Sequence, residues 1–192
     1  TSEFVHLHNH SDYSLLDGAQ RVDQLIDTIS DLNMDSVALT EHGNMFSVVP
    51  YYKQAQKTGI KPIICCEIYV ATGSRFEKKL QPQGGCGNNH LILLAQNYEG
   101  YINLMKLVTI GYLEGFYYRP RIDKEILKEH SEGLIVLSGC PSAELFKKIV
   151  SGDEKSIMNT INWYKDVFGD DYYLEIMRHE HVDNQEKVNQ WI

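Results

Sequence analysis

The 192-residue sequence predicts an α/β protein built as a βα barrel. Short apolar runs suited to strands alternate with helical segments, which is typical of βα units and a parallel sheet. Polar side chains with metal-binding atoms follow four or five successive strands, which favours a closed barrel over an open doubly wound sheet. A complete eight-stranded barrel takes about 250 residues, so we expect a smaller or incomplete barrel forming a single domain.

The first expected strand covers residues 4–11, where histidines stand at alternate positions, His6, His8 and His10. Because side chains alternate between the two faces of a strand, all three rings are expected on one face. Two imidazoles on one face of a strand are well placed to coordinate a divalent metal. The alternative is three half-exposed strand histidines, and this segment alone leaves both interpretations open.

The rest of the chain is read from apolar spacing and turn residues. Apolar side chains at helical spacing, such as Val22, Leu25 and Ile29, predict the first helix, and Gly59 ends the second. Expected helices cover residues 22–32, 48–57, 98–112, 124–129, 143–150, 154–168 and 185–192. Further strands are expected from the apolar runs at residues 36–40, 61–70, 90–95 and 172–177, and a strand with its exit turn at 134–140. Residues 116–121 are expected to form an aromatic loop. Residues 72–88, rich in glycine, glutamine and lysine, are expected to form a mobile insertion, with a hairpin as the alternative.

Composition sets the expected class and location. The chain is 43% hydrophobic and 23% charged, as in ordinary globular domains, and its net charge of −8 argues against broad non-specific duplex binding. Its four cysteines form no CxxC pair, so no disulfide framework is expected and a reducing cytosol fits. We found neither a signal-like N-terminus nor an apolar run of membrane length, so a cytoplasmic protein without membrane contact is expected.

Five further side chains that could bind metal stand near the ends of the expected strands. They are Asp17, His42, Glu67, His90 and Cys140. Each has an ordinary alternative role, as a turn, a loop residue or a small buried side chain. An ordinary role is hardest to assign to Glu67, because burying a lone carboxylate inside an apolar strand costs free energy unless it has a partner. Together with His8 and His10 these nitrogen, oxygen and sulfur donors suit zinc, manganese or iron.

Five segments carry a family resemblance. They are HLHNHSDYSLLDG at residues 6–18, ALTEHGNM at 38–45, KPIICCE at 61–67, GYLEGFYYRPRI at 111–122 and LSGC at 137–140. Covering nearly the whole chain in order, they resemble the N-terminal polymerase-and-histidinol-phosphatase (PHP) domain of bacterial DNA polymerase III alpha subunits. Two departures, Glu41 where the family usually has aspartate and Cys65 where glycine is common, touch no presumed ligand.

The resemblance implies a distorted seven-stranded barrel of PHP type holding two to three divalent metals, zinc before manganese or iron. Seven side chains would bind them: His8, His10, Asp17, His42, Glu67, His90 and Cys140. By the family pattern, the first ion takes His8, His10 and Glu67, and Glu67 bridges to a second. His90 and Cys140 complete the second, and Asp17 and His42 belong to a third. The family's closing Asp-x-His motif is absent, so we expect truncation before the last strand and under-occupied metals.

The resemblance also implies a function. Metal-dependent phosphodiester hydrolysis, acting as a 3′→5′ proofreading exonuclease, is expected within a replicative DNA polymerase whose nucleotidyltransferase domains lie elsewhere. DNA and the other polymerase III holoenzyme subunits are the expected partners. Arg119, Arg121, Tyr117 and Tyr118 are candidate DNA contacts, with packing against neighbouring polymerase domains as the alternative. A structural scaffold is the second function considered. A stand-alone histidinol-phosphate-type phosphatase is the third, and it is disfavoured because residues 111–122 match the polymerase branch.

Overall fold

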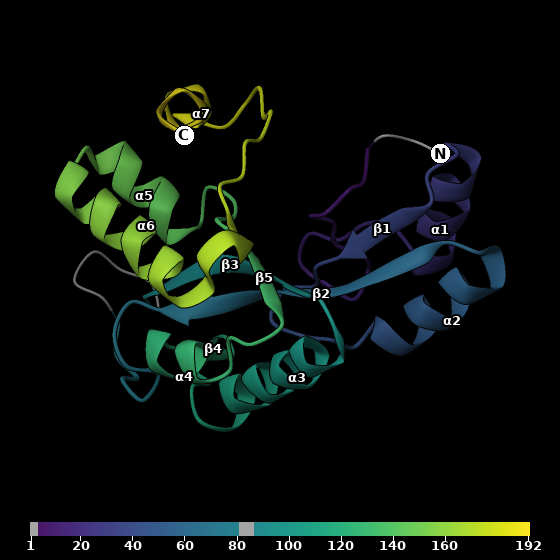
Figure 1. The fold of residues 1–192 in the computed structure, drawn as a ribbon, viewed down its shortest axis with the longest axis horizontal. Helices are drawn as coiled ribbons and strands as arrows, with labels where there is room; N and C mark the ends of the chain where they lie inside the picture. The colour runs from purple at the N-terminus through teal and green to yellow at the C-terminus, as the bar shows by residue number, and fades with distance from the viewer. Residues whose placement is uncertain (1–3, 81–86) are drawn as a thin grey trace. The chain divides into compact units, whose positions relative to one another are not determined.

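The computed structural model describes residues 4–80 and 87–192. The chain divides into two units, Thr1–Glu67 and Ile68–Ile192. Figure 1 shows their helices and strands along the chain. Strand β2 (Lys61–Ala71) is continuous and contributes residues to both units. We describe each unit by itself.

The first unit consists of two helices packed on a short parallel pair of strands. Its elements are α1 (Val22–Asp31), β1 (Ser36–Leu39), α2 (Val48–Thr58) and the first residues of β2. Strand β1 pairs parallel with β2 from Ser36 opposite Lys61 to Leu39 opposite Ile64. Helix α2 ends at Gly59, whose φ of 75° is a left-handed conformation that glycine adopts at little cost. The predicted positions of both helices and both strands are confirmed to within two residues.

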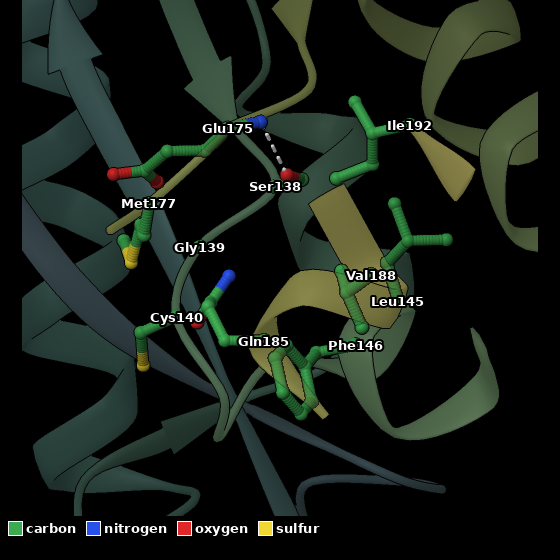
Figure 2. Close-up of a pocket in the computed structure, with 10 residues that line it drawn as sticks. All are labelled: Ser138, Gly139, Cys140, Leu145, Phe146, Glu175, Met177, Gln185, Val188 and Ile192. Carbon is green, nitrogen blue, oxygen red and sulfur yellow. Dashed lines mark hydrogen bonds between the residues drawn. The ribbon is translucent and has the colours of Figure 1, made fainter. Parts of the chain in front are cut away.

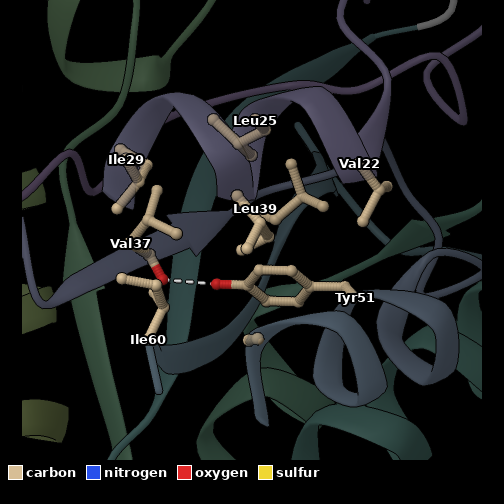
Figure 3. Packing of buried hydrophobic residues seen from close by; sticks show 9 residues of the cluster. Val22, Leu25, Ile29, Val37, Leu39, Tyr51 and Ile60 are labelled. Atoms are coloured by element: carbon tan, nitrogen blue, oxygen red, sulfur yellow. Dashed lines mark hydrogen bonds between the residues drawn. The ribbon is translucent and has the colours of Figure 1, made fainter. Parts of the chain in front are cut away.

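A hydrophobic core holds these elements together. Figure 3 shows Leu25 and Ile29 of α1 facing Val37 and Leu39 of β1, with the ring of Tyr51 beneath them. The Tyr51 hydroxyl donates to the carbonyl of Val37, so its one polar atom is satisfied inside the core. Helix and strand apolar faces therefore meet as the spacing predicted.

Residues 4–11 do not form the regular strand that the sequence predicted. The segment is extended beside β1, where Ala38 N donates to His6 O at 2.9 Å and Thr40 N donates to Asn9 O at 2.7 Å. These bonds are too few and too irregular for a ladder, and only Ser11 forms an isolated bridge, to Gln20. The physical reason is that side-chain contacts, such as Asn9 N to Thr40 Oγ1 at 3.1 Å, replace part of the backbone pairing.

The second unit contains the remaining strands and helices. They are β3 (Asn88–Ala95), α3 (Tyr98–Leu113), β4 (Arg121–Ile122), α4 (Lys124–Glu129), β5 (Leu134–Leu137), α5 (Glu144–Ser151), α6 (Glu154–Phe168), a 3₁₀ turn (Gly169–Asp171), β6 (Tyr172–Tyr173) and α7 (Gln185–Trp191). All the predicted helices are present. Strand β6 is shorter than predicted, and β5 ends at Leu137, before the residues expected to form its exit turn. Strand β4 was not expected, because Arg121 was assigned to a loop.

Strand pairing in this unit corrects the predicted fold. Strand β4 pairs parallel with β2, and β6 pairs parallel with β5, but β3 and β5 are antiparallel. Among the described residues the strand order β1-β2-β3-β5-β6 does not return to its start, so the fold is α/β with a mixed sheet and a closed TIM-like barrel is not confirmed. The antiparallel pairing could not be predicted from the apolar runs, because a strand buried on both faces has the same sequence pattern in parallel and antiparallel sheets.

The predicted insertion at residues 72–88 lies partly outside the described residues, at 81–86. Its described first part, 72–80, forms no helix or strand, and Arg75 anchors it. The Arg75 guanidinium contacts Glu114 at 2.7 Å and Asp123 at 3.1 Å, and Arg75 N donates to Asp123 Oδ2 at 2.9 Å. Within residues 4–80 and 87–192, we find no helix with the length and apolar character needed to cross a bilayer.

Gly100→Ala is expected to lower the free energy of unfolding by at least about 2 kcal/mol. A Cβ at this position in α3 would lie 1.8 Å from the backbone oxygen of Gly133, so helix and loop must separate. Gly111→Ala, in the same helix, is the matched control, because its Cβ would meet Pro120 C at 3.3 Å. There we expect a change within about 1 kcal/mol. Urea denaturation measures both, and equal losses would contradict the packing argument.

Candidate metal centre

Glu67 is the centre of a side-chain cluster in the first unit. Its side chain, on β2, is fully buried. Its Oε2 atom lies 3.4 Å from His8 Nε2, 3.1 Å from His10 Nε2 and 3.1 Å from His42 Nδ1. A buried carboxylate is costly unless positive charge or hydrogen bonds compensate it. The buried Glu67 carboxylate, surrounded by three imidazoles, therefore requires a compensating positive charge or hydrogen bonds.

Two backbone segments bring these rings to Glu67. His8 and His10 lie on the extended segment beside β1, and alternation puts them on the same side, as predicted. His6 is exposed, and its ring meets the ring of Phe4 edge-on at 4.9 Å. His42 follows β1 and forms an isolated parallel bridge with Glu67. The rings of His10 and His42 then stack, with centroids 4.1 Å apart.

The ring nitrogens of His10 and His42 have distinct partners. His10 Nδ1 lies 2.6 Å from the carbonyl oxygen of Thr40, which can only accept a hydrogen bond, so Nδ1 carries the proton. His42 Nε2 lies 2.8 Å from Asp17 Oδ2, and this carboxylate likewise assigns the proton to Nε2. In the neutral rings the remaining nitrogen of each has a lone pair, and that nitrogen is the one facing Glu67.

This arrangement fits a bound cation. Lone pairs on His10 Nε2 and His42 Nδ1 converge on a carboxylate oxygen, and a positive ion between them removes the repulsion. Burial lowers the pKa of His42, and the nearby Glu67 charge only partly opposes this. The neutral ring, which is the metal-binding form, is thereby favoured over imidazolium. Metal-binding histidines typically donate their other ring N–H to a carbonyl or a carboxylate, as Thr40 and Asp17 accept here.

Asp17 reaches His42 from a short loop. Ser14 O accepts from Asp17 N at 3.1 Å and from Gly18 N at 2.9 Å, which closes the turn that presents the carboxylate. The Asp17 side chain is 54% exposed, whereas that of His42 is 16% exposed. The structure thus joins Asp17 directly to His42. Their assignment to a third ion stays a prediction.

Sequence reasoning missed the residues that support this loop. Glu41 is buried, and its carboxylate accepts hydrogen bonds from the hydroxyls of Ser11 and Ser14. The available signal was a carboxylate beside His42 at the end of an apolar strand. Glu41 was recognised as a departure from the family, but its partners, 27 and 30 residues away, were not apparent from spacing.

The two remaining predicted ligands meet in the second unit. Cys140 Sγ lies 3.5 Å from His90 Nδ1, and the ring of Tyr69 meets the His90 ring edge-on at 5.0 Å. Antiparallel pairing explains the contact, because it places the end of β5 beside the start of β3, with Leu137 opposite Ile92. The sharing of an ion between this pair and Glu67 stays a prediction.

A small pocket adjoins Cys140. Figure 2 shows Cys140 and Gly139 at one side of it and Gln185, at the start of α7, at another. Its volume of about 10 Å³ suits a single water molecule and is too small for a nucleotide. The pocket is therefore not a substrate site.

The candidate DNA contacts differ in exposure. Arg121 is 2% exposed, and its guanidinium donates to the backbone oxygens of Gly115 at 3.0 Å and Glu77 at 3.0 Å. These contacts use the donors of Arg121 inside the unit and weigh against its predicted DNA contact, which stays a prediction. Tyr118 is 66% exposed and has a φ of 58°, while Tyr117 and Arg119 are half-buried.

A family model and two similar proteins indicate the family of the chain. The PHP domain family model matches residues 6–179. The chain is 51% identical over 189 residues to the DNA polymerase III subunit alpha of Borreliella burgdorferi and 44% identical over 190 residues to that of Thermus aquaticus. Each alignment covers 98% of this chain and 16% of the relative. The chain thus spans about a sixth of the length of the curated relatives it matches.

A solved structure supports the fold independently. A protein from Bifidobacterium adolescentis, classed as a metal-dependent phosphoesterase, superposes with a TM-score of 0.56 at 9% sequence identity. The superposition covers 98% of this chain and 83% of the other. At this identity the likeness concerns the fold alone.

Proposed function

The chain belongs to the PHP domain family, and from this we propose that it is the PHP domain of a bacterial DNA polymerase III alpha subunit, with a metal-dependent phosphodiesterase site. The observation that carries the proposal is the buried Glu67 carboxylate facing three imidazole nitrogens within 3.4 Å. The sequence identity of 41–51% to alpha subunits over nearly the whole chain supports the proposal that the parent protein is such a subunit.

Two to three divalent ions would occupy the site, zinc before manganese or iron, at reduced occupancy because the 192 residues contain no Asp-x-His motif. His8, His10 and Glu67 would hold the first, and Glu67 with His90 and Cys140 the second. Asp17 with His42 would hold the third, which would replace the proton that His42 Nε2 shares with Asp17. The first set is supported by ligand atoms that all lie within 4.8 Å of one another. Imidazole and thiolate donors favour zinc, while the carboxylates also accept manganese and iron.

Divalent metals in such sites activate water for attack on phosphorus and offset charge on the phosphoryl oxygens. The chain's own residues orient the metal-binding rings and shield the Glu67 carboxylate from bulk water. Thr40 O and Asp17 fix the ring orientations of His10 and His42, and the apolar strand around Glu67 excludes bulk water. No catalytic residue separate from the metal ligands is proposed.

The substrate would be the 3′ end of a DNA strand, removed one nucleotide at a time in 3′→5′ proofreading. Arg119, Tyr117 and Tyr118 remain proposed DNA contacts, by phosphate pairing and base stacking. The exposed ring of Tyr118 and the neighbouring Tyr117 ring, 4.8 Å away, support this part. DNA-directed nucleotide addition, holoenzyme partners and a cytoplasmic location follow from the proposed parent polymerase.

Metal content per chain and nucleotide release together test the proposed function. We expect plasma mass spectrometry to find bound divalent metal, and the metal-loaded chain to release mononucleotides from single-stranded DNA labelled at its 5′ end. A chelator should stop the release. Histidinol phosphate serves as the control substrate and should be hydrolysed poorly.

Two outcomes would overturn the proposal. Metal uptake without nucleotide release would favour a metal-stabilised scaffold. Faster hydrolysis of histidinol phosphate than of DNA would favour a phosphatase.

A further inference from the structure

Glu41 is a second buried carboxylate in the first unit, and it belongs to a hydrogen-bond network beside the metal centre. The residue is 1% exposed and directly precedes His42. Its Oε1 accepts from the Ser11 hydroxyl, and its Oε2 accepts from the Ser14 hydroxyl and, at 3.3 Å, from Ser11 N. All three partners donate, which suits an ionised carboxylate that only accepts.

Ser14 links this carboxylate to both members of the Asp17–His42 pair. The Ser14 hydroxyl donates to Glu41 and accepts from His42 N at 3.0 Å. The backbone oxygen of Ser14 accepts from Asp17 N at 3.1 Å. One residue, held by Glu41, therefore fixes the backbone positions from which the two side chains meet at 2.8 Å.

The loop has little freedom to compensate if Glu41 is lost. A Cβ on Gly18 would lie 1.7 Å from the backbone oxygen of Ser11, so the two ends of the loop are in direct backbone contact. Ser11 is also the residue that Glu41 holds through both hydroxyl and N–H. A shift at Ser11 would therefore move Gly18 and the adjacent Asp17.

We propose that Glu41 is a positioning residue of the metal centre, which holds the Ser11–Gly18 loop so that Asp17 orients the His42 ring. The inference rests on the proposed metal-binding function. It goes further because it assigns a role to a residue outside the proposed ligand set. A residue needed only for core packing would be apolar here, since a buried carboxylate is stabilising only when its acceptors are used.

Glu41→Gln keeps the side-chain shape and tests the network in the 192-residue chain. The hydroxyls of Ser11 and Ser14 accept from Tyr13 N at 3.2 Å and His42 N at 3.0 Å, and each gives its single O–H to Glu41. A hydroxyl that faced an NH₂ group instead would have to turn this O–H away and accept a second bond. The amide NH₂ of glutamine presents a donor to one of them, and the loop must shift. We expect a ten- to hundredfold weaker metal affinity, as is usual when a residue that supports a ligand is changed.

Two readouts and one matched variant separate positioning from general loss of stability. Histidine ring ¹⁵N shifts in the metal-free chain report whether His42 retains its Nε2–H form, and competition with a chelator reports metal affinity. Glu144→Gln is the control, because Glu144 is also largely buried, lies in the other unit, and pairs with Lys124 at 2.9 Å. It should lower the melting temperature and leave both readouts unchanged. Glu41→Asp, which keeps both acceptor oxygens, should recover part of the affinity lost in Glu41→Gln.

The inference would be overturned if Glu41→Gln left the ¹⁵N shifts of His42 and the metal affinity as they are in the unaltered chain. Equal effects of Glu41→Gln and Glu144→Gln would also overturn it, since both would then act through stability. If the unaltered chain takes up no metal, the proposed function fails, while the His42 shifts of the metal-free variants still decide whether Glu41 positions the pair.

Discussion

Glu67→Gln should abolish the proposed metal binding at the histidine cluster and with it the proposed phosphodiesterase activity. Glutamine has nearly the same shape, but it removes the negative charge on which His8, His10 and His42 converge. A metal at a hundredfold excess over its dissociation constant stabilises the folded chain by about 2.7 kcal/mol. We expect thermal unfolding of the unaltered chain to show this gain and Glu67→Gln to lose it.

Asp123→Asn is the matched control for this experiment. Asp123 is another buried carboxylate, 6% exposed in its side chain, which pairs with Arg75 at 3.1 Å. Its loss should lower stability equally with and without metal, because it lies outside the cluster residues. A metal-dependent gain that survives in Glu67→Gln would show that Glu67 is not a ligand.

Arg121→Met should lower the free energy of unfolding by at least about 3 kcal/mol, because several buried acceptors would lose their donor. The guanidinium donates to the backbone oxygens of Gly115 and Glu77 and lies 5.2 Å from the centroid of the Tyr117 ring. Methionine fills similar volume but has no N–H. Urea denaturation measures the loss, with DNA binding assayed under conditions where the variant is folded.

Arg119→Met is the control for Arg121→Met. Arg119 is half-buried and lies over the Tyr69 ring at 5.8 Å, a contact of about 0.5–1 kcal/mol. We expect a small stability loss and a clear loss of DNA affinity, the reverse of the pattern for Arg121. A folded Arg121→Met chain that binds DNA more weakly than Arg119→Met would contradict the structural role of Arg121.

Much of the secondary structure could be predicted because its causes are local. Helix α2 follows from apolar spacing and from Gly59, whose left-handed conformation ends it. Strand β4 could not be predicted, since two residues carry no periodicity and only pairing of Tyr69 with Arg121 and of Val70 with Ile122 defines the strand. The direction of β5 was equally hidden, because an apolar run does not encode the orientation of its partner.

The sequence by itself determined which residues are chemically equipped for a metal site. Alternating histidines and a carboxylate in an apolar strand are informative because each is costly or unusual without a ligand. Only the tertiary structure decided how they meet: His10 and His42 turn lone pairs toward Glu67, Cys140 reaches His90 through an antiparallel pair, and Glu41 holds the Asp17 loop. Such contacts join segments far apart in the chain, and their geometry depends on the packing of the intervening elements, which no local pattern records.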